Sequence, residues 1–171
     1  MSDTPRVLVL LGSRSDLGVM EETAAALRKL EIPFQMTVRS AHRTPDETRD
    51  TVRDAEERGA QVVICAAGLA AHLAGVVASH SMLPVIGVPM PGGPAGGLDA
   101  LLSTVQMPGG IPVATVALGK AGARNAAFLA ARILALGDPA LADRLEAHRQ
   151  GMARQVLADA AAVERDHSGR G

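Results

Sequence analysis

Short apolar runs alternate with amphipathic stretches along most of the chain. Continuous apolar runs at residues 7–11, 62–66 and 84–88 are typical of strands buried on both faces. Two more strands are predicted at residues 34–38, where polar and apolar residues alternate, and at 113–118. Apolar positions at helical spacing predict helices at about 17–30, 45–59, 70–79, 98–105 and 123–136.

Repeated strand–helix units of this kind predict an α/β fold with right-handed crossovers and helices on both faces of a parallel sheet. Five strands fit the flavodoxin-like order, a three-layer sandwich formed by residues 6–136 of a single domain, 1–171. A further amphipathic helix at about 138–166 follows the completed sheet. We expect it to pack on a neighbouring subunit of an oligomer; the alternative is that it folds back on its own domain. Residues 165–171 are expected to fray.

Composition excludes several classes of function. In 171 residues the charged fraction is 20% and the net charge is −1, so no broad basic surface for nucleic acid or membrane is predicted. Aromatic side chains are almost absent, which disfavours stacking on bases or a flavin. The apolar stretch 62–77 is interrupted by glycines and His72, and we interpret it as core rather than as a membrane span. A single cysteine, Cys65, and an N-terminus unlike a signal peptide predict a cytoplasmic protein.

The segment Ser40-Ala41-His42-Arg43-Thr44-Pro45 is the strongest chemical signal. It lies between a predicted strand and a predicted helix, where ligands bind in open α/β sheets. Thr44, Pro45 and Glu47 have the spacing of a capping box. An imidazole beside a fixed positive charge is suited to proton transfer on an anionic substrate. A solvated loop with incidental charges is the alternative.

The loop after the first strand, Gly12-Ser13-Arg14-Ser15-Asp16, is a second candidate site. Free N–H groups at a helix start, together with the hydroxyls of Ser13 and Ser15, favour a phosphate. Asp16 would repel a phosphate and is expected either to accept hydrogen bonds from sugar hydroxyls or simply to cap the helix. The loop has neither the G-x-G-x-x-G nor the Walker A pattern, so dinucleotide and ATP binding are not supported.

Small residues after the third strand, Gly68, Ala70 and Ala71, would let a ligand approach the backbone, and N–H groups there could hold a carboxylate. His72 follows them and serves either the site or the structure. The loop 91–97 is rich in glycine and proline, and a tight loop is expected at 119–122, where Lys120 lies. The five histidines show no metal-ligand spacing.

Six blocks in register, between residues 7 and 136, resemble the PurE family of purine biosynthesis. They are Gly12-Ser13-x-Ser15-Asp16, Ser40-Ala41-His42-Arg43-Thr44-Pro45, Ala70-Ala71-His72-Leu73, Leu83-Pro84-Val85-Ile86-Gly87-Val88-Pro89, Val105-Gln106-Met107-Pro108-x-Gly110-Ile111-Pro112-Val113 and Gly119-Lys120-Ala121-Gly122.

The resemblance is to the class I branch, which converts N5-carboxyaminoimidazole ribonucleotide (N5-CAIR) to 4-carboxy-5-aminoimidazole ribonucleotide (CAIR). It implies a mutase that works as an octamer without metal or organic cofactor, and that could receive its substrate from the ATP-dependent N5-carboxylating enzyme. It also implies that His42 is the general acid and base, that Ser13, Asp16 and Arg43 bind the ribonucleotide, and that Ser15 and Ser40 assist at the phosphate.

Some positions depart from the class I pattern. Leu69 replaces a usual Gly, Ala74 a usual Pro and Leu17 a common Trp, and residues 91–96 lack a frequent Ser-Lys pair. These departures bear on loop closure and carboxylate handling more than on reaction type. The alternatives are a class II carboxylase that uses aminoimidazole ribonucleotide (AIR) and CO2, a pyridine-nucleotide carboxylase of nickel-cofactor assembly, and a non-enzymatic flavodoxin-like protein or receiver domain.

Overall fold

The strands form one parallel sheet in the computed structural model, which describes residues 4–168. Their bounds are β1 Val7–Leu11, β2 Phe34–Val38, β3 Val62–Ala67, β4 Val85–Pro89 and β5 Ala114–Thr115. The order is β2-β1-β3-β4-β5, with every neighbouring pair parallel. This order confirms the predicted flavodoxin-like arrangement.

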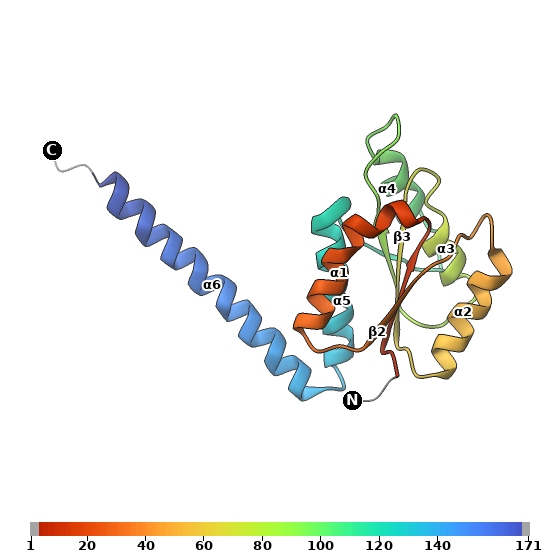
Figure 1. The fold of residues 1–171 in the computed structure, drawn as a ribbon, viewed down its shortest axis with the longest axis horizontal. Coiled ribbons are helices and arrows are strands. Elements are labelled where there is room, and N and C mark those ends of the chain that lie inside the picture. Colours follow the sequence, from red (N-terminus) through yellow and green to blue (C-terminus); the bar gives the residue numbers. More distant parts are fainter. Residues whose placement is uncertain (1–3, 169–171) are drawn as a thin grey trace.

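Alternate side chains of strand β1 pack on opposite faces of the sheet and belong to two separate parts of the core. Val7, Val9 and Leu11 pack with the buried face of α1 (Leu17–Lys29) and of α5 (Gly119–Ala135). Leu8 and Leu10 pack on the opposite side, with residues of α2 (Pro45–Glu57) and α3 (Leu73–Ala78). Figure 1 shows α1 beside α5 on one side of the sheet and α2 with α3 on the other. Because both faces are covered, the strands need the continuous apolar runs seen in the sequence.

The last strand–helix unit differs from its prediction. The strand expected at 113–118 is only Ala114–Thr115, and α5 begins at Gly119 instead of near residue 123. β5 is an edge strand with one partner, and Pro112 before it has no N–H for a ladder. The predicted tight loop 119–122 is therefore the first turn of α5. A methyl group at Gly122 would collide with the carbonyl oxygen of Ala117, so the glycine permits this early helix start.

The third helix is also shorter than predicted, because α3 begins at Leu73 rather than at residue 70. Two successive tight turns precede it: Ala71 N–H donates to the carbonyl of Leu69 (2.9 Å) and His72 N–H to that of Ala70 (2.8 Å). The apolar stretch 62–77 is thus divided among strand, turns and a short helix. None of the helices described within residues 4–168 is long and apolar enough to cross a membrane.

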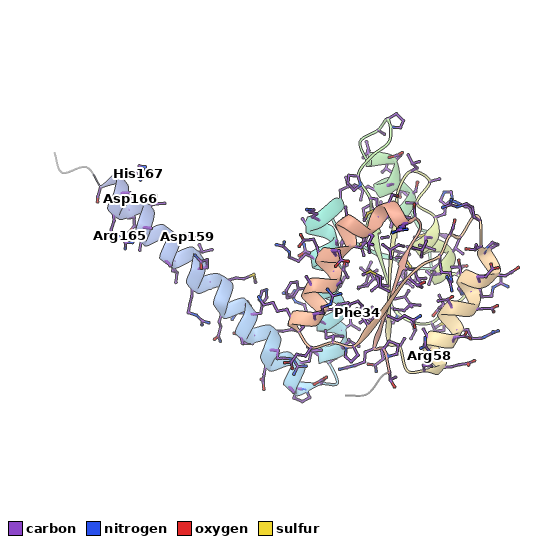
Figure 2. All side chains as sticks on the ribbon, viewed as in Figure 1. Phe34, Arg58, Asp159, Arg165, Asp166 and His167 are labelled. Carbon is purple, nitrogen blue, oxygen red and sulfur yellow. The ribbon has the colours of Figure 1, made fainter. Side chains whose placement is uncertain are left out.

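The final helix, α6 (Pro139–His167), begins on its own domain and then leaves it. Asp138 caps it by accepting from Leu141 N–H (3.0 Å) and pairs with Arg6 (2.6 Å), while Leu141 is fully buried in the core. The first turns of this helix therefore pack on their own domain, which was the alternative expectation. Figure 1 shows the rest projecting from the domain, and Figure 2 shows Asp159 and His167 far from the sheet.

The end of α6 differs from the frayed tail expected for residues 165–171. Residues 165–167, expected to fray, are helical. Residues 169–171 of that expected tail, like residues 1–3, lie outside the described part of the chain. One further helix, α4 (Leu98–Val105), matches its predicted bounds.

Candidate active site

A cavity of ≈ 550 Å³ opens at the carboxyl edge of the sheet, where the loops after β1, β2, β3 and β4 meet. Parallel strands bring their carboxyl ends to one edge, which is why the candidate loops of the sequence gather there. The lining residues are Gly12, Ser13, Ser15, Asp16, Ser40, Ala41, His42, Arg43, Ala67, Gly68, Leu69, Ala70, Leu73, Met90, Pro91, Gly92 and Gly93.

The loop after β1 is folded by its own side chains. Ser13 caps a short 3-10 helix, η1 (Arg14–Asp16): its hydroxyl accepts from Ser15 N–H (3.3 Å), and Asp16 Oδ2 accepts from Ser13 N–H (3.2 Å). Ser15 Oγ also donates to Ser13 Oγ (2.9 Å). This reciprocal pair is a capping box. It holds Ser13, Ser15 and Asp16, which all line the cavity, in one arrangement and satisfies the N–H of Ser13.

The acidity of Asp16 in this loop is perturbed by its surroundings. Partial burial raises the pKa of its carboxyl above the usual 3.8, and the hydrogen bonds from Ser13 and Ser15 oppose that rise. The carboxylate does not bond to an N–H of the helix that follows, so the interpretation of Asp16 as a simple N-cap is wrong. Asp16 lines the cavity, and its carboxylate has the capacity to accept a further hydrogen bond from a bound hydroxyl.

The loop after β2 is organised differently from its prediction. Pro45 does occupy the first turn of α2, but Thr44 makes no capping bond to that helix. Instead Thr44 Oγ1 accepts from Ser40 N–H and donates to the carbonyl of Ser40 (both 3.1 Å). The predicted capping box is therefore wrong, because the Thr44 hydroxyl closes the loop onto Ser40 instead.

Arg43 connects the first two loops. Its Nε donates to Ser40 Oγ (3.3 Å), and its Nη2 donates to the carbonyl of Gly12 (3.3 Å). Guanidinium groups match phosphate geometry, and this one is held beside the hydroxyls of Ser13 and Ser15. The hydroxyls of Ser13, Ser15 and Ser40 and the guanidinium of Arg43 therefore line one corner of the cavity, where their donors are suited to bind an anion; we call it the anion-binding corner.

His42 and His72 meet although thirty positions separate them in sequence. The Nε2 of His42 lies 2.9 Å from the Nδ1 of His72, and the two rings are edge-to-face with centroids 5.1 Å apart. One nitrogen must carry the proton of this hydrogen bond, so each ring restricts the tautomer of the other. His42 lines the cavity, and the bond leaves its Nδ1 without a partner among the described residues.

The structure brings most of the sequence-predicted residues into one cavity, but not all of them. Ala71 is buried and lies outside the lining, and His72 reaches the site only through His42. Lys120 is in the first turn of α5 and does not line the cavity either.

Two apolar lining residues, Leu73 and Met90, were missed by sequence reasoning. Met90 directly follows β4, so its place after a strand at the same edge was an available signal. Within residues 4–168 no group of three or more His, Cys, Asp or Glu side chains is arranged to hold a metal ion.

Comparison with known proteins identifies the family. The family model described as AIR carboxylase matches residues 6–155. N5-carboxyaminoimidazole ribonucleotide mutase of Mycobacterium leprae is 51% identical over 165 residues, covering 96% of this chain and 95% of the relative. The Pyrococcus horikoshii protein of the same name is 48% identical over 163 residues, with 95% and 91% covered.

Among solved structures, the crystal structure of Treponema denticola PurE superposes with a TM-score of 0.84 at 30% identity, covering 96% of this chain and 99% of that one. The sequence match, the shared fold and the loops gathered at the carboxyl edge agree, and the chain belongs to the AIR carboxylase family.

Proposed function

We propose that this protein converts N5-CAIR to CAIR, an isomerisation that moves a carboxyl group within one ribonucleotide. The observation that carries the proposal is the cavity in which His42 lies beside an anion-binding corner. Relatives at about half identity bear the name of this mutase over nearly the whole chain, which supports the same reaction class here.

The ribonucleotide phosphate fits the corner formed by Ser13, Ser15, Ser40 and Arg43. The hydroxyls donate hydrogen bonds, and the guanidinium supplies the only formal positive charge among the cavity-lining side chains when His42 is neutral. Asp16 is the hydrogen-bond acceptor for the ribose hydroxyls. Gly68 and Ala70 have small or no side chains, so the heterocycle and its carboxylate can approach the backbone of this part of the cavity.

His42 performs both proton transfers. In its cationic form it protonates the carbamate nitrogen, the N–C bond breaks, and CO2 and AIR are formed in the cavity. The nucleophilic ring carbon C4 then attacks CO2, and neutral His42 removes the C4 proton. One proton leaves the imidazole and one returns, so the residue ends each turnover as it began.

His72 has a positioning role in this scheme. With its Nδ1 accepting from the Nε2–H of His42, only Nδ1 of His42 is free to exchange a proton, in both the cationic and the neutral state. The 2.9 Å separation supports this assignment. It resembles the way a second group orients a catalytic imidazole in hydrolases.

A substrate comparison tests the reaction. The enzyme is incubated either with N5-CAIR without bicarbonate or with AIR plus bicarbonate, and CAIR is measured. The mutase forms CAIR rapidly from N5-CAIR; preference for AIR and bicarbonate would instead identify a class II carboxylase. No formation of CAIR from either would refute the proposal, and a pyridine nucleotide included as a third substrate tests the remaining carboxylase.

The role of His42 has its own test. His42→Asn removes proton transfer but keeps a polar side chain, so CAIR formation should fall by about 100-fold or more while ribonucleotide binding, followed by calorimetry, persists. Turnover close to that of the wild-type protein would remove His42 from the mechanism.

The assembly follows from the unpartnered part of α6. Met152, Val156, Leu157 and Val163 are more than half exposed on this helix, and we infer that they pack on neighbouring subunits of an octamer. We also propose that the protein lies in the cytoplasm and that the ATP-dependent N5-carboxylating enzyme delivers its substrate.

Removal of α6 after Leu136 would also delete buried Leu141, so substitution is the cleaner test of assembly. M152K/L157K should reduce the sedimenting mass without unfolding the domain, and an unchanged mass would contradict the inference.

A further inference from the structure

Leu69 adopts a backbone conformation that favours glycine. Its φ is 54°, and Glu31 is the only other non-glycine residue with positive φ within residues 4–168. A leucine in this region is strained because its Cβ approaches the carbonyl oxygen that follows, a cost that glycine does not have. Such outliers at a site motivate a search for what the side chain does.

The path of the chain explains the conformation but not the leucine. The two tight turns that begin at the carbonyls of Leu69 and Ala70 carry the chain into α3 and present His72 to His42. Glycine at position 69 would follow the same path without strain. The reason for leucine must therefore lie in its side chain.

The side chain of Leu69 fills the space beside a second loop, residues 91–97, which Figure 1 shows projecting in green at the top of the molecule beyond α4. A methyl group on Gly93 would collide with Leu69 Cδ2 and lie 3.8 Å from its Cγ. Gly93 itself has a φ of 66° and lines the same cavity as Leu69. The leucine and the bare glycine backbone are therefore complementary surfaces of two loops.

Around this contact the cavity wall is apolar. Leu69, Met90 and Pro91 all line it, and none of their side chains offers a hydrogen bond. CO2 is a small apolar molecule that polar groups hold weakly, so a wall of this kind retains it only by leaving no gap. Leu69 is 56% exposed, so it covers the rim of the cavity and not its floor.

We propose that Leu69 is a positioning residue that seals the 91–97 loop against the β3–α3 loop, and so retains CO2 between its release from the carbamate nitrogen and its capture by C4. This inference rests on the proposed mutase reaction. The strain at position 69 is then the cost of a seal that glycine cannot make.

Isotope exchange measures the seal directly. N5-CAIR of natural carbon composition is converted in buffer containing ¹³C-bicarbonate, and early CAIR is analysed by mass spectrometry. The label that N5-CAIR itself acquires without catalysis is measured in the presence of the H42N variant and subtracted. Sealed CO2 gives unlabelled CAIR, whereas leakage introduces label and releases AIR. Leu69→Gly should raise the labelled fraction of CAIR about fivefold. Losing roughly 1 kcal/mol of apolar contact between the two loops would change the ratio of open to closed cavity by that factor.

Stability separates this role from a general structural one. Leu69→Gly relieves the strained φ, so its Tm should equal or exceed that of the wild-type protein while its leakage rises. Leu69→Ala keeps the strain but loses the seal, and should leak as well. Leu102→Ala, at a leucine that is 47% exposed on α4 and outside the cavity lining, is the matched control and should not leak.

The outcomes distinguish the two proposals. Labelling in both Leu69 variants with none in Leu102→Ala supports the seal. Unlabelled CAIR from both Leu69 variants overturns it while leaving the mutase reaction intact. Failure of the wild-type protein to form CAIR from N5-CAIR overturns the reaction and, with it, the seal.

Discussion

Replacement of His72 tests whether the contact between the two histidines matters for catalysis. His72→Ala removes the acceptor 2.9 Å from His42 Nε2 and leaves the imidazole of His42 free to rotate and to change tautomer. For the neutral state of His42, a hydrogen bond between neutral groups contributes about 0.5–1.5 kcal/mol. If that contribution applies to the reactive orientation, kcat should fall roughly 2- to 12-fold.

Steady-state kinetics of CAIR formation is the assay, and it separates positioning from binding. KM should change little, because His72 does not line the cavity. His72→Asn should recover much of the lost rate, since its amide oxygen can accept from Nε2–H. A kcat for His72→Ala equal to that of the wild-type protein would refute the reasoning, as would an equally large loss in His72→Asn.

Three further predictions concern other parts of the molecule. Arg43→Ala removes the charge at the anion-binding corner. Steady-state kinetics at varied substrate concentration should show KM raised about 10- to 150-fold with kcat less affected, because charged hydrogen bonds worth about 1.5–3 kcal/mol are lost. Burial raises the pKa of Asp16, so the contribution of this group to folding stability is present below pH 3.8 and is lost as the pH rises through the higher native value. In denaturant unfolding, Asp16→Asn should therefore gain stability relative to the wild-type protein over that rise in pH. The same variant should bind the ribonucleotide more weakly. Gly122→Ala should lower Tm by the equivalent of about 1–3 kcal/mol because its methyl group would overlap the Ala117 carbonyl, whereas Gly18→Ala, with no heavy atom within 4 Å of the new methyl group, should be neutral or stabilising by about 1 kcal/mol.

These three predictions fail in different ways. An unchanged KM in Arg43→Ala would remove Arg43 from phosphate binding, and parallel stability curves for Asp16→Asn and the wild-type protein would contradict the raised pKa. Equal Tm values for the two glycine variants would show that the approach of Gly122 to Ala117 has no energetic consequence.

Much of the architecture is local in origin and could be predicted. Short apolar runs such as Val7–Leu11 are typical of strands covered on both faces, and short connections with right-handed crossovers leave few possible orders for five of them. Their carboxyl ends then share one edge. The loops containing Ser13, His42 and Gly68 each follow a strand at this edge, and the cavity unites them.

Local patterns failed where two interactions competed for the same group. Thr44 has the right spacing for a capping box with Glu47, but its hydroxyl bonds to Ser40 instead. The capping box occurs between Ser13 and Asp16, where the sequence pattern was interpreted as phosphate and sugar binding. Gly119–Gly122 resembled a loop, and only the close approach to Ala117 explains why glycine is needed inside a helix.

By itself the sequence determined the strand and helix types, the sheet edge that carries the chemistry and the residues available there, because each depends on periodicity and residue type. Only the tertiary structure decided that His72 bonds to His42, that Leu69 packs on Gly93 and that α6 leaves its domain after Leu141 is buried. Those contacts join segments distant along the chain. Their geometry depends on how far each loop reaches across neighbouring strands, which no pattern within a single segment records.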